Sequence, residues 1–265
     1  MKKTQDANKK IAKQAAENKS MESPWRLAMK RLSRNKLAIA GLIFLGVMIV
    51  LCIVGPIVSP YSDITATDIA NAKQPPSAQH WFGTDENGRD VFTRLLYGGR
   101  ISMTVGLAAT ALQIFIGALL GCTAAYYGGV VDFVIMRVVD VILSLPTMPI
   151  LIMLSAMMSD WKVDTGVRVY YLMVILAAIG WAGTCRYIRG QVLSIREMDY
   201  MSAAESLGIR DLHKIFKHIM PNVIPIIIVT ATLAIGDTII MESTMSYLGV
   251  GVLPPMSSWG QMVSA

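Results

Sequence analysis

Residues 37–58 read LAIAGLIFLGVMIVLCIVGPIV, an apolar run of 22 residues without a charged side chain. A helix of about 20 apolar residues crosses the ~30 Å hydrocarbon core of a bilayer. Across the whole chain of 265 residues, 54% are hydrophobic and only 16% are charged, and the mean hydropathy is +0.50. This composition excludes an ordinary soluble domain and predicts an all-α, polytopic helical membrane protein.

Four further apolar runs are long enough to cross a membrane, which gives five expected spans. They lie near Leu37–Val58, Ile101–Tyr126, Val134–Met158, Val169–Ile188 and Val223–Tyr247. The expected organisation is a basic tail with an interfacial helix at 1–36, the first span at 37–58, an outer loop at 59–100 and a core at 101–265. Within the core, a charged stretch at 200–222 separates the last two spans.

Lysine and arginine predict the orientation, because positive charge is retained on the cytoplasmic side. Eleven basic residues precede the first span and six lie between Arg186 and Lys217, whereas the loop at 59–100 holds four against five acidic residues. The N-terminus and the stretch 200–222 are therefore expected inside, and 59–100 outside. Topology and contact with membrane lipid account for the net charge of +6, so no nucleic-acid partner is expected.

The region before the first span has two parts. Residues 1–23 are polar and lysine-rich without an apolar period, which predicts a mobile tail. Residues 25–34 place one apolar stripe among arginine and lysine side chains, a pattern suited to a helix in the inner headgroup layer.

Neither a disulfide nor a metal site is expected on this chain. The three cysteines are far apart in apolar runs and lack metal-ligand spacing: Cys52, Cys122 and Cys185. The three histidines lie outside the spans: His80, His213 and His218. The chain has eighteen methionines, which could suggest soft-metal transport, but the cluster Met148, Met153, Met157 and Met158 lacks a helical register, so packing is favoured.

The stretch 200–222 has the pattern of two short helices joined by a turn. Gly208 permits the positive φ that ends the first helix. Asp211 is a favoured N-cap for the second, and apolar residues follow it at helical spacing until Pro221, which is expected to end that helix. Met201, Ala204, Leu207 and Gly208 recur at helical spacing and predict a face that another surface can approach closely. An amphipathic hairpin on the membrane surface is the alternative.

The same stretch resembles the EAA loop of bacterial ATP-binding-cassette importer permeases. Its Ala203-Ala204 pair, Gly208 and Met220-Pro221 match the motif positions. In that family the loop docks into the ATP-binding subunit. The resemblance implies a coupling role for Ser202, Ala203, Ala204, Glu205, Gly208, Asp211, Phe216 and Pro221. Ser202 stands where the motif usually has glutamate, and Glu205 is the nearest carboxylate that could replace it.

Further motifs extend the resemblance from about Pro24 to the C-terminus. They are Arg34–Leu37, the segment HWFGTDENGRDVFTRLLYGGRI at 80–101, Tyr127–Gly129 with Arg137–Asp140, and Ser246–Gly251. Together they are similar to the C-type permease subunit of dipeptide, oligopeptide and nickel importers. The resemblance implies a MetI-like permease bundle in the bacterial inner membrane. The family has a sixth span, so this chain is expected to be truncated or incompletely recorded.

The resemblance also implies partners. These are a second permease subunit, two ATP-binding subunits, an extracytoplasmic substrate-binding protein and a peptide substrate. ATP and Mg²⁺ are expected on the partner subunits, with no cofactor on this chain, which is not expected to be an enzyme by itself. Dipeptides, longer peptides, nickel chelates and haem are all compatible as cargo.

The run Gly83–Gly88 has the spacing of a phosphate-binding loop, but its chemistry argues against one. Arg89 stands where that loop needs lysine, and Asp90 where it needs a hydroxyl. Asp85 and Glu86 would face the phosphates. We therefore expect no nucleotide site here.

Several residues inside the spans carry specific expectations. Gly117 and Gly121 form a small-xxx-small pair, for which packing within the subunit is favoured over a contact with a second subunit. Arg137 and Asp140, three residues apart, are expected to pair on one helix face.

Two carboxylates lie within the last span. Asp237 and Glu242 are five residues apart, about 140° around a helix, so they cannot share one site. Each is either a residue of the translocation path or a satisfied buried acid. If one of them coupled transport to an ion gradient, the chain would be a stand-alone secondary transporter, which is the alternative function. A membrane anchor or scaffold is a third interpretation.

Overall fold

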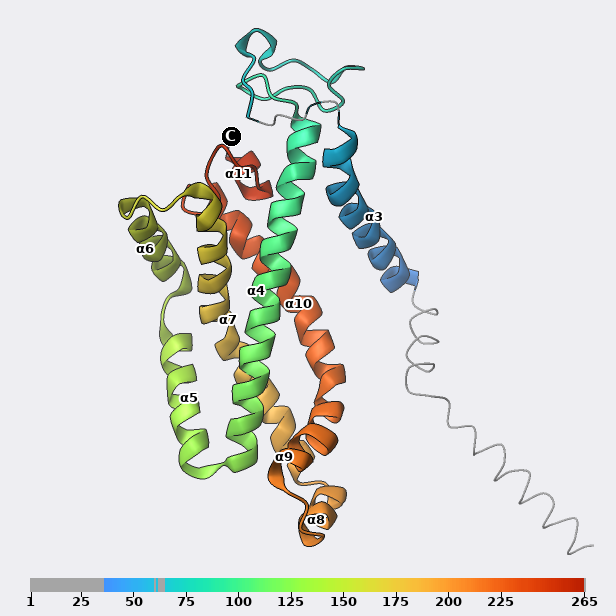
Figure 1. The fold of residues 1–265 in the computed structure, drawn as a ribbon, viewed down its shortest axis with the longest axis vertical. Coiled ribbons are helices and arrows are strands. Elements are labelled where there is room, and N and C mark those ends of the chain that lie inside the picture. Colours follow the sequence, from blue (N-terminus) through green and yellow to red (C-terminus); the bar gives the residue numbers. More distant parts are fainter. Residues whose placement is uncertain (1–35, 60, 62–64, 265) are drawn as a thin grey trace, which may run out of the picture. The chain divides into compact units, whose positions relative to one another are not determined.

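The computed structural model describes residues 36–59, 61 and 65–264, which are predominantly helical (Figure 1). The chain divides into two compact units, residues 1–51 and 52–265. The predicted tail and the interfacial helix at 25–34 lie outside the described residues. Helix α3, Lys36–Val58, matches the first predicted span. Its apolar side chains are largely exposed, as expected for a helix that meets lipid or another protein.

The second unit is built on three long helices (Figure 1). These are α4 (Val91–Tyr127), α7 (Thr165–Arg196) and α10 (Met220–Tyr247). Helix α4 packs along both α7 and α10. Four described helices are long and apolar enough to cross a membrane, or five if a bent pair counts as one span.

The bent pair occupies the predicted third span, Val134–Met158, which Pro146 and Pro149 interrupt. It consists of α5 (Gly129–Ser144) and α6 (Thr147–Asp160), and their axes differ by 83°. The break falls at Leu145, because the ring of Pro146 pushes the preceding residue into the extended conformation seen there. Pro149 lies in the first turn of α6, where a missing N–H costs no helical hydrogen bond.

Helix α4 begins ten residues earlier than predicted. The carboxylate of Asp90 accepts a 2.7 Å hydrogen bond from the backbone N–H of Thr93, so Asp90 is the N-cap. The last part of the predicted outer loop is therefore helical. Helix α7 also begins earlier, at Thr165, with Asp164 capping it through the N–H of Gly166.

Glycines allow α4 and α7 to approach closely. A Cβ added at Gly117 would lie 2.7 Å from Cβ of Thr184, and one added at Gly121 would lie 2.7 Å from the carbonyl oxygen of Cys185. Both glycines of the small-xxx-small pair thus pack within the subunit, which confirms the favoured interpretation.

The stretch 200–222 folds as two short helices, as predicted, but its exit differs. Helix α8 (Asp199–Ser206) is followed by Gly208 with φ +68°, and α9 (Asp211–Lys214) runs through a π-helix at Ile215–Ile219 into α10. The prediction that Pro221 ends the second helix was wrong. Pro221 lies in the first turn of α10, a position that tolerates proline, so the helical path continues.

The second unit has two distinct ends (Figure 1). We call the end of α4 near residues 65–90 the loop end and the end near α8 and α9 the α8 end. The loop end also carries the 3₁₀ turn Ile69–Asn71 and helix α11 (Trp259–Val263). Within this unit, the outer loop and the stretch 200–222 thus lie at opposite ends, as the charge pattern predicted.

Candidate functional site

The predicted close-approach face of α8 is divided between the core and the surface. Met201 is 5% exposed and Ala204 is 4% exposed. Met201 packs in an apolar cluster with Ile188, Ile195 and Ile219. Met201 and Ala204 therefore face the subunit itself, which corrects the prediction that they share a face with Leu207 that is offered to another surface.

Five of the exposed residues form what we call the α8–α9 surface, defined as Ser202, Ala203, Leu207, Gly208 and Phe216. Leu207 is 79% exposed and Phe216 is 65% exposed. A Cβ added at Gly208 would have open space around it. Pro221 is also exposed, whereas the side chain of Glu205 lies outside the described part of the structure. Large apolar side chains exposed on a charged loop are typical of a protein interaction site.

Asp211 anchors this loop to the end of α4. Its carboxylate accepts a hydrogen bond of 2.5 Å from the hydroxyl of Tyr126 and lies 3.0 Å from Nζ of Lys214. Tyr126 and Lys214 together hold the pKa of Asp211 below its ordinary value. The hydrogen bonds with Tyr126 and Asp211 raise the pKa of Lys214, so this lysine stays protonated. Asp211 thus has a visible positioning contact beside its predicted coupling role.

A second contact joins the two sides of the loop. The amide of Asn222 donates to the hydroxyl of Tyr200 over 3.2 Å, and also to the carbonyl oxygen of His218. The start of α8 is therefore tied directly to the start of α10.

Ion pairs join α7 to α5 near the same end. Arg189 binds Asp132 with two nitrogens, one of them at 2.6 Å. Asp140 pairs with Arg186, while the guanidinium of Arg137 lies 5.0 Å from the ring centroid of Phe133. The predicted Arg137–Asp140 pair is thus replaced by a contact across helices, because the carboxylate reaches the facing helix.

The two carboxylates of the last span have opposite surroundings. Asp237 is exposed, whereas Glu242 is 1% exposed and accepts hydrogen bonds from the hydroxyls of Ser102 and Ser246. The expectation that they do not share a site is confirmed. Glu242 has the geometry of a satisfied buried acid, and Asp237 is the carboxylate open to a path or a partner.

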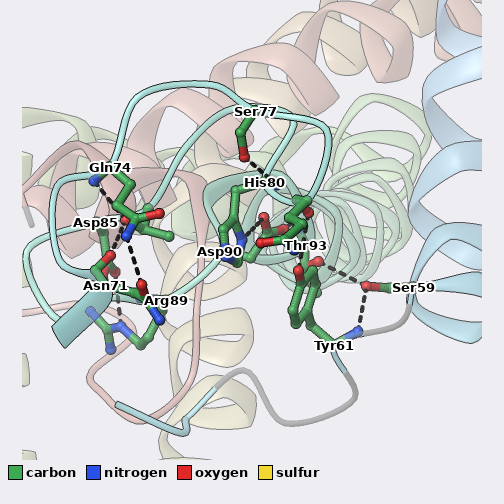
Figure 2. Close-up of polar contacts among 12 residues, drawn as sticks. Ser59, Tyr61, Asn71, Gln74, Ser77, His80, Asp85, Arg89, Asp90 and Thr93 are labelled. Atoms are coloured by element: carbon green, nitrogen blue, oxygen red, sulfur yellow. Dashed lines mark hydrogen bonds and ion pairs between the residues drawn. The ribbon is translucent and has the colours of Figure 1, made fainter. Parts of the chain in front are cut away.

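The outer loop is ordered by its own polar side chains (Figure 2). Asp85 accepts hydrogen bonds from the backbone N–H groups of Asn87 and Arg89 and from Nε of Arg89, and it also pairs with Arg94. Burial alone would raise the pKa of Asp85, but the hydrogen bonds from Arg89 and Asn87 lower it below its ordinary value. The N–H groups that a phosphate would need are therefore directed at the loop's own carboxylate.

Two other contacts close the loop onto the start of α4. Figure 2 shows His80 directed at Asp90, with Nδ1 3.0 Å from the carboxylate. The ring of Tyr61 stacks on His80 with centroids 5.1 Å apart. The N-cap of α4 thus also orders the preceding loop.

Three buried polar residues were not predicted. Arg94 donates to Gln261 over 2.7 Å, Arg168 donates to Ser155 and Ser159, and Gln113 joins α4 to the carbonyl oxygen of Leu176. Only Gln113 lies inside a predicted span, where a polar side chain needs a partner; Arg94 and Arg168 lie outside the predicted spans, so the sequence held no such signal for them. The partners of Arg94 and Gln113 lie 167 and 63 residues away in the sequence and could not be assigned.

Comparison with known proteins identifies the class. Residues 113–265 match the family of the binding-protein-dependent transport system inner membrane component, and residues 23–76 match the N-terminal transmembrane domain of oligopeptide transport permease C. The chain is 38% identical to the oligopeptide transport system permease protein OppC of Bacillus subtilis, over 93% of this chain and 78% of that protein. It is 40% identical to the dipeptide transport system permease protein DppC of the same organism, over 89% of this chain and 72% of that protein.

A relative from another organism is similar to nearly the same extent. The oligopeptide transport system permease protein OppC of Haemophilus influenzae is 36% identical over 91% of this chain and 76% of its own length. The family match covers more than half of the chain and is consistent with its apolar helices. The chain belongs to the family of inner membrane permease components of binding-protein-dependent transport systems.

Proposed function

We propose that this chain is one transmembrane subunit of an ATP-driven importer for dipeptides or oligopeptides. The observation that carries the proposal is the similarity to three peptide permease proteins over at least 89% of the chain. The proposed complex contains a second permease subunit, two ATP-binding subunits and an external substrate-binding protein. ATP and Mg²⁺ are bound by the ATP-binding subunits.

Coupling is assigned to the α8–α9 surface. Leu207 and Phe216 are exposed on a loop that otherwise carries charged side chains, and burial against a partner would remove this apolar area from water. Gly208 lets the partner approach closely. Movement of the ATP-binding subunit would then act on α9 and, through the π-helix, on α10.

The alternative of a stand-alone, ion-coupled transporter is not supported by the family match. Asp237 instead becomes a candidate for the translocation path, because an exposed carboxylate on an apolar helix requires water or a polar partner. The N-terminus and α8 are assigned to the cytoplasm, on the basis of the lysine and arginine distribution.

A charge substitution at the α8–α9 surface tests the coupling assignment. Leu207→Asp should abolish ATP-dependent peptide uptake into proteoliposomes and release the ATP-binding subunit, because a buried unpaired charge costs several kcal/mol. Val263→Asp is the matched control, since Val263 is 73% exposed at the loop end. Normal uptake with the ATPase still bound to Leu207→Asp would refute the assignment.

Ala204→Arg serves a different purpose. Because Ala204 is buried against its own subunit, arginine there should unfold α8 before any partner is involved. The variant therefore separates loop folding from docking, when protease sensitivity of the isolated subunit is measured beside ATPase binding.

A further inference from the structure

The segment Ser246–Gly251, noted in the sequence but not used by the coupling surface, folds back across the end of α10. Gly249 has φ +74°, a conformation that favours glycine. At Gly251 an added Cβ would collide with Oγ of Ser246, so this turn packs directly against the helix that precedes it. We call residues 246–252 the return turn.

Glu242 holds one side of the return turn through hydroxyl groups. Ser246 donates to Oε1 of Glu242 over 2.7 Å and accepts a 2.9 Å hydrogen bond from the backbone N–H of Val252. Ser102 of α4 donates to Oε2 over 2.8 Å and accepts one of 3.2 Å from the backbone N–H of Trp259. Both side-chain oxygens of Glu242 thus accept a hydrogen bond from a hydroxyl group.

Arg168 holds the other side of the same turn. Its guanidinium, 2% exposed, donates to the carbonyl oxygen of Val250 over 3.2 Å. The same group donates to Oγ of Ser155 on α6 over 2.6 Å, and Ser155 in turn donates to Val250. The buried guanidinium of Arg168 therefore binds a carbonyl group, while Glu242 holds two N–H groups through the hydroxyls of Ser102 and Ser246.

The segment after the return turn lies in a notch on α4. A Cβ at Gly98 would lie 3.1 Å from the carbonyl carbon of Ser258, and one at Gly99 would lie 2.9 Å from the Trp259 ring. The indole N–H of Trp259 donates to the carbonyl oxygen of Leu95 over 3.1 Å. Glycines leave room for the segment, and Ser102 connects it to Glu242.

We propose that Glu242 and Arg168 are positioning residues that clamp the return turn, and through it residues 252–259, to the outer ends of α4, α6, α7 and α10. The clamp makes the loop end one block that moves together. It explains why an arginine and a glutamate are buried there. Arg168 binds the carbonyl oxygen of Val250, and Glu242, through Ser246, holds the N–H of Val252, whereas the N–H groups of residues 248–250 bond to the end of α10 itself. If the chain imports peptides, as proposed above, this block would close the translocation path during import. The clamp itself does not depend on the proposed function.

The clamp is tested with a reporter thiol in the purified full chain. Val252→Cys places a thiol of similar size at a position that is 1% exposed, and the native cysteines are all buried, so the parent chain supplies the background. Adding Glu242→Leu should raise the rate of maleimide labelling at position 252 at least about tenfold, which corresponds to about 1.4 kcal/mol of lost closing free energy. Glu242→Gln keeps the shape of the side chain and one acceptor oxygen, so its labelling rate should lie between those of the Val252→Cys parent and the Glu242→Leu variant.

Matched controls separate local opening from general destabilisation. Asp237→Leu makes the same kind of change at an exposed carboxylate on the same helix and should leave labelling at 252 unchanged. A second reporter, Ile219→Cys, lies buried at the α8 end and should stay unlabelled in Glu242→Leu. Unchanged labelling at 252, or a rise at both reporters, would overturn the proposal.

A second variant covers the case in which Glu242→Leu fails to fold. Ser246→Ala removes the acceptor of the Val252 N–H and should also raise labelling at 252. An unchanged rate in this variant would overturn the proposal. The assay needs neither ATPase nor peptide, so its outcome is independent of whether the chain imports peptides.

Discussion

At the scale of single residues, the α4–α7 contact depends on missing side chains. Gly121 lets α4 lie against the backbone of α7, where an added Cβ would lie 2.7 Å from the Cys185 carbonyl oxygen. Gly190, also helical, has open space around it. Substitution of Gly121 therefore tests close packing between the helices, whereas the same substitution at Gly190 tests helix propensity alone.

Gly121→Ala should lower the free energy of unfolding by about 1–3 kcal/mol, because overpacking forces the helices apart. Gly190→Ala should be neutral or slightly stabilising, since alanine favours a helix over glycine. Denaturant unfolding of both variants in detergent measures the difference. Equal stabilities would show that the helices adjust freely at Gly121.

Asp85 predicts a pH dependence for the outer loop. Its pKa is lowered in the folded chain, so its contribution to stability is present above the ordinary carboxyl pKa of about 4 and is lost as pH falls through the lowered value. Protease cleavage within residues 65–90 should therefore accelerate as the pH drops below about 4. In Asp85→Asn, cleavage should be faster at neutral pH and change less with pH; a parental pH profile would contradict this.

At the scale of elements, the sequence predicted helices better than their ends. The continuous apolar run of α3 predicts one helix with clear limits. The break at Leu145 and the start of α4 at Val91 depend instead on single residues, Pro146 and Asp90, and limits placed from apolar runs do not follow such local signals. Helical spacing identified the stripe containing Met201 and Ala204, but a small apolar face looks the same whether its own core or a partner covers it. The structure assigns both to the core.

The contact between α4 and α9 gives a prediction for the loop element. Tyr126→Phe removes the hydroxyl that donates to Asp211 and should accelerate hydrogen exchange in residues 209–214. Tyr127→Phe, at the exposed neighbouring position, is the control. Identical exchange in the two variants would mean that Asp211 does not depend on α4 for its position.

At the scale of the whole molecule, a single sequence reveals the protein family and which segments lie at opposite ends, but it reveals few contacts between residues that are distant in the sequence. Charge distribution predicted that 59–100 and 200–222 lie at opposite ends, and motifs predicted the family. The surroundings of Glu242 could not be predicted, because Ser102 lies 140 residues away and hydroxyl groups are common in such helices. Exposed Asp237 and buried Glu242 look equally unusual in the sequence.

The orientation in the membrane is tested by two equal substitutions. Ala78 is exposed in the outer loop and Ala203 is exposed on α8. In intact cells, Ala78→Cys should react with a membrane-impermeant maleimide, and Ala203→Cys should react only after the membrane is opened. Labelling of both from the same side would refute the assigned topology.

The π-helix at Ile215–Ile219 has a mechanical consequence. It joins α9 to α10 without a loop, so residues 211–247 form one helical path with a length of about 55 Å. Hydrogen bonds in a π-helix span five residues instead of the four of an α-helix, and π turns are places where helices bend. The path therefore has two places where it is expected to bend, the π-helix and Pro225, which lies inside α10, and both are near its α8 end. A partner subunit that moves along the axis of α10 and one that moves across it would therefore displace the far end, at Tyr247, by different amounts.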